Sequence, residues 1–383
     1  MNDTHPASAA APASAAAPAS AAAPASAAAP ASAAAPASTA AAASAAASAS
    51  DAQRTLLGVL TGSWTAQALY AITALGVPDL LADGPLTAAR IARDCDADAD
   101  AVHRVLRALA SSGLLEQEDE DVFALTPATA LLRSDAPRSL RETTLMLGEE
   151  VFRSLGGLVA ALRTGTPAFD HVHGTSMYSY LQERPDVART FNAALGSRAA
   201  VPAAWAAVDL TGVGTLVDVG GGDGNLLAEV LAARPGLRGV LLELSEAIAQ
   251  ARTRFAGAGL ADRVTPVEGS FFERVPPGGD LYVLARCLHN WSDDRALDIL
   301  RTVRAELPVG GRLVVLEKVV PAGPGPSPAK VYDLLMLTMV EGRNRTAAEY
   351  RALAEKAGFR IVSVHPAPAT DPLGESALEF TAA

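Results

Sequence analysis

The stretch that decides the fold is Leu216-Val-Asp-Val-Gly-Gly-Gly-Asp-Gly-Asn225. Its apolar first half predicts a buried β-strand, and the glycines predict a sharp turn into a helix that starts near Leu226. Glycine leaves the backbone bare, and the first turn of a helix carries N–H groups without partners in the helix. The stretch therefore predicts a ligand site at a strand-to-helix turn, and a tight turn that binds nothing is the alternative.

From Thr215 onward, apolar segments of strand length alternate with segments of helical periodicity. The expected strands are 215–219, 239–243, 264–267, 280–286 and 311–318, with a final antiparallel strand at 377–381. The expected helices are 223–233, 245–258, 293–306 and 346–357. This alternation predicts an α/β, Rossmann-like domain over residues 211–383, with a parallel doubly wound sheet that binds ligands at the carboxyl ends of its strands.

Length, charge and cysteine usage limit the class of protein. The chain has 383 residues, enough for two domains and a substantial core. A formal net charge of −11 argues against a general nucleic-acid binder. Cys95 and Cys287 provide neither a disulfide framework nor metal-ligand spacing, which fits the reducing cytoplasm. No run of about 18 apolar residues with a membrane-like character occurs, so no membrane partner is expected.

The first fifty residues have a composition of their own. A six-residue repeat carries prolines at 6, 12, 18, 24, 30 and 36 among alanines and serines. A regular proline interrupts helices, and nothing in this region could build a core. Residues 1–50 are therefore expected to form a disordered, semi-extended tail. The tail lacks the basic and leucine-rich regions of a signal peptide.

Residues 51–150 are expected to form a mostly helical winged-helix domain. After a first apolar helix, the pattern predicts helices at 86–93, capped by Thr87, and at 99–112, followed by a hairpin at 114–125. Winged helices often bind DNA, but acidic residues precede the second helix and fill the hairpin turn, where they would repel phosphates. A dimerisation module is favoured over DNA binding.

Residues 151–210 are expected to form a helical connector that lines a substrate pocket. His171 and His173 lie in an interruption at 169–174, where they could bind a metal as a pair or serve in a loop or pocket lining. The loop or pocket-lining role is favoured because no carboxylate or cysteine lies beside them at ligand spacing. The candidate pocket residues, whose spacing fits core packing equally well, are Phe152, Met177, Tyr178, Phe191, Asn192, Met336 and Met339.

Polar and aromatic residues follow the expected strands. Glu243 ends the second strand about twenty residues beyond Gly224, which suits a carboxylate that accepts the hydroxyls of a ribose. The alternative is an ordinary acid before a helix. His289 follows the fourth strand, where chemistry is favoured over a structural role. The residues expected to bind the cofactor are Asp218, Gly220, Gly222, Gly224, Glu243, Ser270, Phe271 and Arg286.

Residues from about 55 to 380 resemble the plant-type and bacterial polyketide small-molecule O-methyltransferases. The resemblance is carried by 218–224, 269–272, 288–293, 308–313 and 342–346, and segment 252–272 is most similar to enzymes that tailor aromatic polyketides. It implies S-adenosylmethionine as cofactor, S-adenosylhomocysteine as product, and a homodimer formed through the N-terminal domain. It also implies a planar aromatic hydroxyl compound as substrate.

The same resemblance implies that His289 is the general base and that Glu317 orients it. Asn344 stands where plant enzymes carry a second acid, and Ser270 and Asn290 replace aspartates that are common in the family. A metal-dependent site, with Asn290, Asp293 and Asp294 as ligands, is less favoured because the two aspartates more simply cap the next helix. Relatives that bind S-adenosylmethionine without methylating remain the runner-up, and a winged-helix regulator is a further alternative.

Overall fold

The computed structural model describes residues 37–197, 201–368, 371 and 374–383. The chain divides into two units, Met1–Leu60 and Thr61–Ala383, which are described separately below. Within the described ranges, no helix is long and apolar enough to cross a membrane.

Helix α1 (Ala37–Ala74) contains the described part of the first unit and continues into the second. Of the tail expected at 1–50, residues 1–36 lie outside the described residues. From Ala37 onward the expectation of a disordered tail is wrong. The proline repeat ends at Pro36, and the alanine-rich segment that follows has high helix propensity without a residue that breaks the helix.

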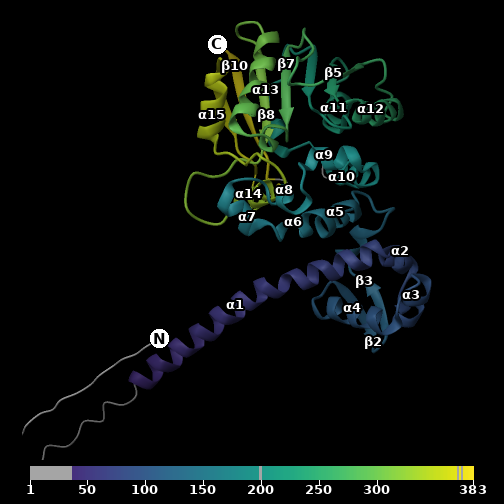
Figure 1. Ribbon diagram of the computed structural model, residues 1–383. Helices are drawn as coiled ribbons and strands as arrows, with labels where there is room; N and C mark the ends of the chain where they lie inside the picture. Colours follow the sequence, from purple (N-terminus) through teal and green to yellow (C-terminus); the bar gives the residue numbers. More distant parts are fainter. Residues whose placement is uncertain (1–36, 198–200, 369–370, 372–373) are drawn as a thin grey trace, which may run out of the picture. The chain divides into compact units, whose positions relative to one another are not determined.

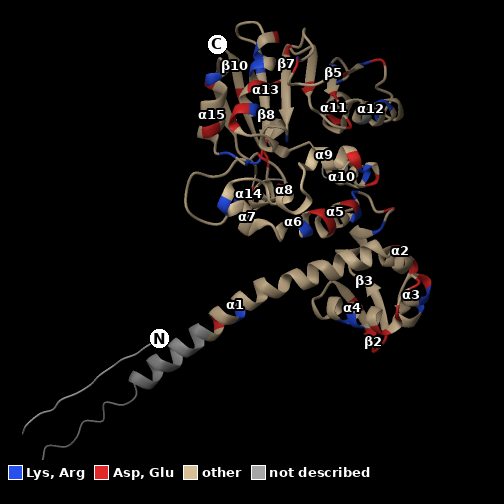
Figure 2. Cartoon of the chain, viewed as in Figure 1, with Lys and Arg blue, Asp and Glu red and all other residues tan. Residues whose placement is uncertain are grey.

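The winged-helix part of the second unit follows α1. Its elements are α2 (Val77–Leu80), a 3₁₀ turn (Leu81–Asp83), β1 (Leu86–Thr87), α3 (Ala88–Asp94), α4 (Ala99–Ser111), β2 (Leu115–Asp119), β3 (Val122–Leu125) and a second 3₁₀ turn (Thr129–Leu132). The strands pair in the order β1-β3-β2. The Thr87 hydroxyl caps α3 by accepting the N–H of Arg90 at 3.2 Å, as expected. Figure 2 shows acidic residues at β2.

The helical connector is built from short helices. They are α5 (Arg141–Met146), a π-helical turn (Leu147–Val151), α6 (Phe152–Leu155), α7 (Leu158–Thr164), α8 (Ala168–His173), α9 (Met177–Glu183) and α10 (Pro185–Ser197). The interruption expected at 169–174 is wrong, because α8 occupies it and ends at Gly174 in the left-handed region. Phe169 is fully buried and stacks on His173 with ring centroids 4.2 Å apart, which stabilises this turn of helix.

The α/β domain contains the expected sheet. Its strands are β4 (Thr215–Val219), β5 (Arg238–Glu243), β6 (Val264–Glu268), β7 (Leu281–Ala285), β8 (Arg312–Glu317), β9 (Phe359–His365) and β10 (Ser376–Ala382). In the described chain they form a seven-stranded sheet in the order β6-β5-β4-β7-β8-β10-β9. The parallel strands and the antiparallel β10 are confirmed. No strand was expected at 359–365, where every second residue is exposed, as on an edge strand.

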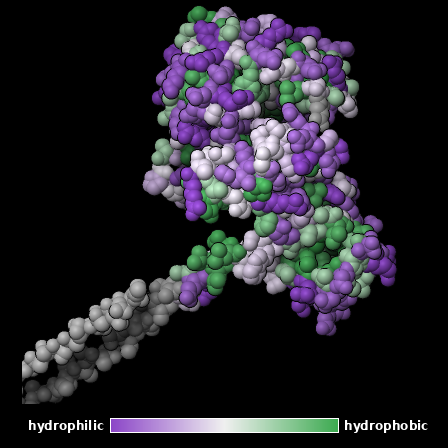
Figure 3. Space-filling view, viewed as in Figure 1, coloured by the Kyte–Doolittle hydropathy of each residue, from purple (hydrophilic) through white to green (hydrophobic). Residues whose placement is uncertain are grey.

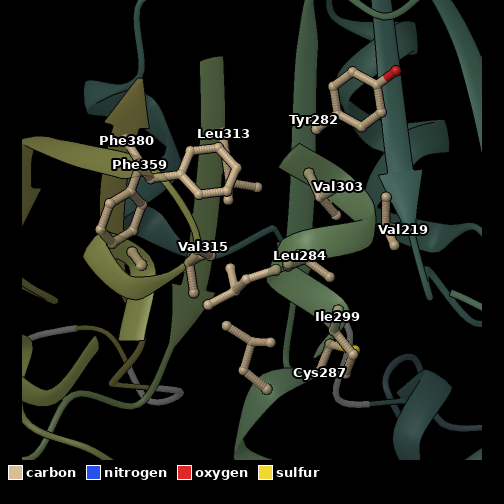
Figure 4. Close-up of a cluster of buried hydrophobic side chains, with 14 of the residues drawn as sticks. Val219, Tyr282, Leu284, Cys287, Ile299, Val303, Leu313, Val315, Phe359 and Phe380 are labelled. Atoms are coloured by element: carbon tan, nitrogen blue, oxygen red, sulfur yellow. The ribbon is translucent and has the colours of Figure 1, made fainter. Parts of the chain in front are cut away.

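Helices cover both faces of this sheet (Figure 1). The helical elements of this part of the chain are a 3₁₀ turn (Ala203–Ala207), α11 (Asn225–Ala232), α12 (Ser245–Gly257), a 3₁₀ turn (Leu288–Asn290), α13 (Asp293–Glu306), α14 (Pro328–Met339) and α15 (Ala347–Lys356). Helix α14 packs with α6, α7 and α8 of the connector rather than on the sheet. Alternate strand residues face opposite layers. On one face, Leu313 and Val315 pack with Ile299 and Val303 of α13 (Figure 4). Val314 and Leu316 pack in the opposite layer, which contains residues of α11 and α12.

Candidate active site

Five neighbouring parallel strands bring the candidate residues to one edge of the sheet. Strands β6, β5, β4, β7 and β8 are adjacent in that order, and parallel strands share the edge at which they end. The glycine loop follows β4, Glu243 ends β5, and Ser270 and Phe271 follow β6. His289 follows β7, and Glu317 ends β8. Residues far apart in the sequence therefore meet at one site.

The glycine loop is open to a ligand at one position and packed at another. Gly222 and Gly224 have φ of 60° and 75°, a region that favours glycine. A Cβ on Gly222 would meet no heavy atom within 4 Å, whereas a Cβ on Gly224 would lie 2.4 Å from Cζ of Phe255. Gly222 therefore leaves bare backbone for a ligand, and Gly224 lets α12 pack against the loop.

Glu243 contacts this loop directly. Its Oε2 accepts the Gly222 N–H at 3.0 Å, and its Oε1 accepts the Leu244 N–H at 2.7 Å. Burial raises the pKa of Glu243, and the two backbone hydrogen bonds oppose that shift. Leu244, not Glu243, is the N-cap of α12. Because each carboxylate oxygen has two lone pairs, both can still accept a ligand hydroxyl, which favours the ribose role.

Asp218 places an unsatisfied carboxylate beneath the loop. It is fully buried, and neither oxygen has a hydrogen-bond partner among the described residues. Burial raises the pKa of Asp218 to about 7, Glu243 adds to the shift, and Arg286 opposes it. Buried polar atoms in native proteins nearly always have partners. Together with the open backbone at Gly222, this acid fits a ligand that brings hydrogen-bond donors or positive charge, as S-adenosylmethionine does.

The remaining candidate cofactor residues divide into two groups. The Phe271 ring packs on the loop, since a Cβ on Gly220 would lie 3.0 Å from its Cε1, and Ser270 Oγ accepts the Phe272 N–H at 3.2 Å. Both therefore shape the wall of the site. Arg286 is different, because its Nε donates to both oxygens of the buried Glu375 at 2.7 and 2.9 Å. Its guanidinium is bound to the protein itself.

His289 and Glu317 form the central pair. Glu317 is 0% exposed; its Oε1 accepts the backbone N–H of His289 at 3.2 Å, and its Oε2 pairs with His289 Nδ1. A carboxylate at Nδ1 favours the tautomer with its proton there, which leaves Nε2 as an acceptor. The geometry agrees with the base and orienting roles expected for these two residues.

Asn344 does not join this pair through a hydrogen bond that the described residues show. Its backbone N–H donates to Asp333 Oδ1 at 2.7 Å, and its side-chain Nδ2 donates to the Ala329 carbonyl at 3.3 Å. Both partners lie on α14. Asn344 therefore links its loop to α14. Among the described residues, no hydrogen bond joins its side chain to the His289 imidazole that it was expected to support.

The possible metal ligands have other partners. Asn290 Nδ2 donates to the Arg286 carbonyl at 3.3 Å, and Asp293 pairs with Arg343 and Arg345. Asp293 and Asp294 do not cap α13 as expected; they lie in its first turn, and Ser292 is its N-cap. In the connector, His171 Nε2 hydrogen-bonds Thr164 Oγ1 at 2.9 Å. No group of three or more His, Cys, Asp or Glu side chains that could hold a metal ion occurs in the described part of the chain.

The structure brings four of the seven candidate pocket residues into one apolar cluster. Met177, Phe191, Met336 and Met339 belong to a cluster that also contains Phe169 and Tyr180. All but Met336 of these residues line a narrow cavity of about 10 Å³, roughly the room that one water molecule needs. Tyr178 instead stacks on Trp291, at 5.1 Å between centroids and 9° between planes. Phe152 is 39% exposed, and Asn192 is partly exposed on α10.

Two residues of this site were not assigned a role from the sequence. Trp291 follows His289 closely and contacts Phe271, Phe272 and Tyr178. Arg345 is fully buried and bonds to the backbone on either side of His289. Both lie inside segments that carry the family resemblance, at 288–293 and 342–346, but a motif letter alone does not show which way a side chain points.

Models of two protein families match the chain. An O-methyltransferase domain matches residues 152–360, and an O-methyltransferase dimerisation domain matches residues 57–135. The chain belongs to the O-methyltransferase family. The fold expected from the sequence, a helical dimerisation domain joined to an α/β methyltransferase domain, is confirmed.

Curated relatives cover most of the chain. A phenazine O-methyltransferase from Lysobacter antibioticus is 38% identical over 313 residues, 81% of this chain and 92% of that protein. An O-demethylpuromycin O-methyltransferase from Streptomyces alboniger is 40% identical over 329 residues, 84% of this chain and 87% of that protein. These names place the family in natural-product tailoring.

Solved structures have the same fold. A mitomycin 7-O-methyltransferase superimposes with a TM-score of 0.82 at 35% identity, over 88% of this chain and 99% of that one. An O-methyltransferase from neocarzinostatin biosynthesis, in complex with S-adenosylmethionine and 2-hydroxy-5-methyl naphthoic acid, has a TM-score of 0.73 at 34% identity, over 83% of this chain and 96% of that one. The cofactor expected from the sequence is thus present in a homologous structure.

Other relatives have names for different reactions. A phenazine-1-carboxylate N-methyltransferase from Pseudomonas aeruginosa is 33% identical over 319 residues, 83% of this chain and 95% of that protein. An aclacinomycin 10-hydroxylase from Streptomyces purpurascens is 36% identical over 327 residues, 83% of this chain and 87% of that protein. Membership of the family therefore does not by itself identify the reaction that this chain catalyses.

Proposed function

We propose that this protein is an S-adenosylmethionine-dependent O-methyltransferase that methylates a hydroxyl group of an aromatic natural product, with His289 as general base. The observation that carries the proposal is the His289–Glu317 pair, which lies on the same sheet edge as the glycine loop. S-adenosylmethionine, when bound, supplies an electrophilic methyl group on a sulfonium sulfur. Gly222, Glu243 and Asp218 are the residues of this chain that would hold it.

His289 would take the hydroxyl proton at Nε2 while Glu317 holds Nδ1. A phenol with a pKa of about 10 loses its proton to an imidazole of pKa about 6.5 at a cost of roughly 5 kcal/mol. Loss of the proton during attack, rather than before it, avoids most of that cost. The resulting imidazolium is stabilised by the buried carboxylate at its other nitrogen, because charge pairs are strong where water is excluded.

The connector provides a surface for a flat apolar substrate. Met177, Phe191 and Met339 line the narrow cavity, and methionine side chains adapt to different apolar shapes. The Tyr178–Trp291 stack joins this connector to the loop that carries His289. The apolar lining suits an aromatic substrate, which the lining side chains would have to move apart to admit.

We further propose that the active form is a homodimer assembled through the N-terminal domain. Leu56, Leu57, Leu60 and Trp64 of α1 are each at least 59% exposed, and Figure 3 shows hydrophobic surface on the described part of α1. A second copy of this chain would cover such a surface. The match to a dimerisation domain over residues 57–135 supports this assembly.

The second candidate function is S-adenosylmethionine-supported chemistry without O-methylation, as the hydroxylase name of one relative illustrates. The oriented base favours O-methylation, because a reaction without hydroxyl deprotonation has no need of it. N-methylation of an aromatic amine is the closest variant, and it makes weaker use of a base.

One experiment separates these functions. The full-length protein is incubated with methyl-labelled S-adenosylmethionine and a panel of aromatic phenols and amines, and the products are analysed by mass spectrometry. O-methylation predicts transfer of the label to a phenol and S-adenosylhomocysteine as co-product. Label on amines alone would move the assignment to N-methylation. Bound but unconsumed cofactor across the whole panel would support the runner-up.

A further inference from the structure

The loop that carries His289 is held in place by the side chain of Arg345. This guanidinium is 0% exposed, and it donates to the Leu288 carbonyl at 2.9 Å and to the Trp291 carbonyl at 2.7 Å. Those two carbonyls flank His289 on either side. Arg345 Nε also donates to Asp293 Oδ1 at 3.0 Å, which balances its buried charge.

Gly342 packs against the same turn. A Cβ on Gly342 would lie 2.1 Å from the His289 carbonyl oxygen and 2.4 Å from the Trp291 nitrogen. Only a residue without a side chain allows this approach. The segment 342–345 therefore touches the backbone of residues 288–291 at two independent points.

We propose that Arg345 is a positioning residue, which sets the imidazole of His289 against Glu317 by fixing the backbone carbonyls on both sides of the histidine, with Gly342 providing the close approach. This inference rests on the proposed role of His289. Neither Arg345 nor Gly342 contacts substrate or cofactor in this assignment. Their effect passes through the backbone to the ring.

The physical reason is the shape of the turn. Residues 288–290 form a single 3₁₀ turn, preceded by Arg286 with φ of 55°, an unusual conformation for a residue with a side chain. So short a turn contributes few hydrogen bonds of its own. Glu317 aligns the imidazole only if the backbone stays in place, because the same carboxylate also accepts the His289 N–H.

Arg343 offers a matched control. Its side chain pairs with the other oxygen of Asp293 at 2.7 Å, yet it is 51% exposed, and no hydrogen bond joins its side chain to the 288–291 backbone among the described residues. Loss of Arg343 weakens the anchorage of Asp293 without freeing the Leu288 or Trp291 carbonyl. The Arg343 variant therefore shows whether an effect comes from weaker anchorage of Asp293 or from loss of the Arg345 hydrogen bonds to the Leu288 and Trp291 carbonyls.

The test uses the imidazole itself and needs no substrate. The cofactor-free, full-length protein is isotopically labelled at the histidine ring nitrogens, and the His289 signals are assigned with a His289→Asn variant. At fixed pH, the NMR chemical shifts of the two ring nitrogens report which of them carries the proton. In the native chain the Glu317 carboxylate at Nδ1 should hold the proton on that nitrogen. We expect Arg345→Gln and Gly342→Ala to give a mixture of the two tautomers, Arg345→Lys to restore part of the native preference, and Arg343→Gln to leave it unchanged.

The kinetic counterpart is measured on a phenol that the panel shows to be turned over. We expect Arg345→Gln to lower kcat about 30- to 100-fold with cofactor affinity unchanged, as for a displaced catalytic group. If Arg345→Gln does not fold, Gly342→Ala carries the test with Arg345 intact. Native chemical shifts of the His289 ring nitrogens in the folded variants would overturn the proposal, and so would equal effects of Arg345→Gln and Arg343→Gln. Failure of the phenol panel would remove the proposed function, but the NMR comparison could still be made.

Discussion

Glu317 uses its two oxygens on a single residue, accepting the His289 backbone N–H at 3.2 Å with one and pairing with Nδ1 of the same residue with the other. This arrangement couples the position of the turn to the orientation of the ring. It also leaves His289 Nε2 as the nitrogen that can take a proton from a substrate. The catalytic proposal depends on that relationship more than on any motif.

His289→Ala should abolish the base while leaving the cofactor residues intact. We expect turnover of an accepted phenol to fall at least about 100-fold. The cofactor dissociation constant, measured by calorimetry, should stay within about threefold of the native value. His171→Ala, in the connector, is the control and should behave as the native protein. Near-native turnover in His289→Ala would refute the general base.

Glu243→Ala should weaken cofactor binding more than it slows chemistry. Loss of charge-assisted hydrogen bonds to a ligand costs about 1.5–3 kcal/mol, which corresponds to roughly a 10- to 150-fold rise in the dissociation constant. Glu268→Ala is a matched control, because Glu268 is exposed at the end of β6 and is the register partner of Glu243. Equal cofactor affinity in the two variants would exclude the ribose role.

The raised pKa of Asp218 makes stability depend on pH. The pKa of this carboxyl is about 7 in the fold against 3.8 as the ordinary value, so between these pH values the folded state binds a proton that the unfolded state has lost. Stability from this group is complete below about pH 4, falls as pH rises, and is lost above about pH 7, with a limit near 4 kcal/mol.

The Asp218→Asn substitution removes the titrating carboxyl group and nearly preserves the shape of the side chain. Urea unfolding of the cofactor-free protein should show that the variant gains stability relative to the native chain, by up to about 4 kcal/mol, between about pH 4 and pH 8. A difference in unfolding free energy that stays constant over this range would show that Asp218 is ionised in the fold.

Two alanine substitutions in the glycine loop separate the cost of backbone strain from the cost of a packing clash. Gly222→Ala imposes a left-handed conformation in open space, which costs about 1–2 kcal/mol of unfolding free energy. Gly224→Ala adds a clash with the Phe255 ring, so its loss should be larger by about 1–3 kcal/mol. Equal losses of unfolding free energy in the two variants, measured with urea, would show that α12 moves without cost to admit the added methyl group.

The sequence by itself determined most of the α/β domain and the positions at which functional residues occur. The periodicities of strands and helices depend on neighbours along the chain, so β4 to β8 and α12 could be predicted. The same pattern placed Glu243 at the end of one strand and His289 just after another. Local pattern was insufficient where packing decides. The edge strand β9 and the helix α8 were not predicted for this reason.

Tertiary structure alone decided which side chains meet. The family resemblance already implied that Glu317 orients His289. Only the folded chain directs Arg286 to Glu375, turns Asn344 toward α14, and buries Arg345 against the 288–291 backbone. The direction of a side chain depends on the packing of segments that are distant in sequence, and burial of charge depends on a partner from another element. For that reason the family motifs located the site, whereas the contacts that orient its base required the folded chain.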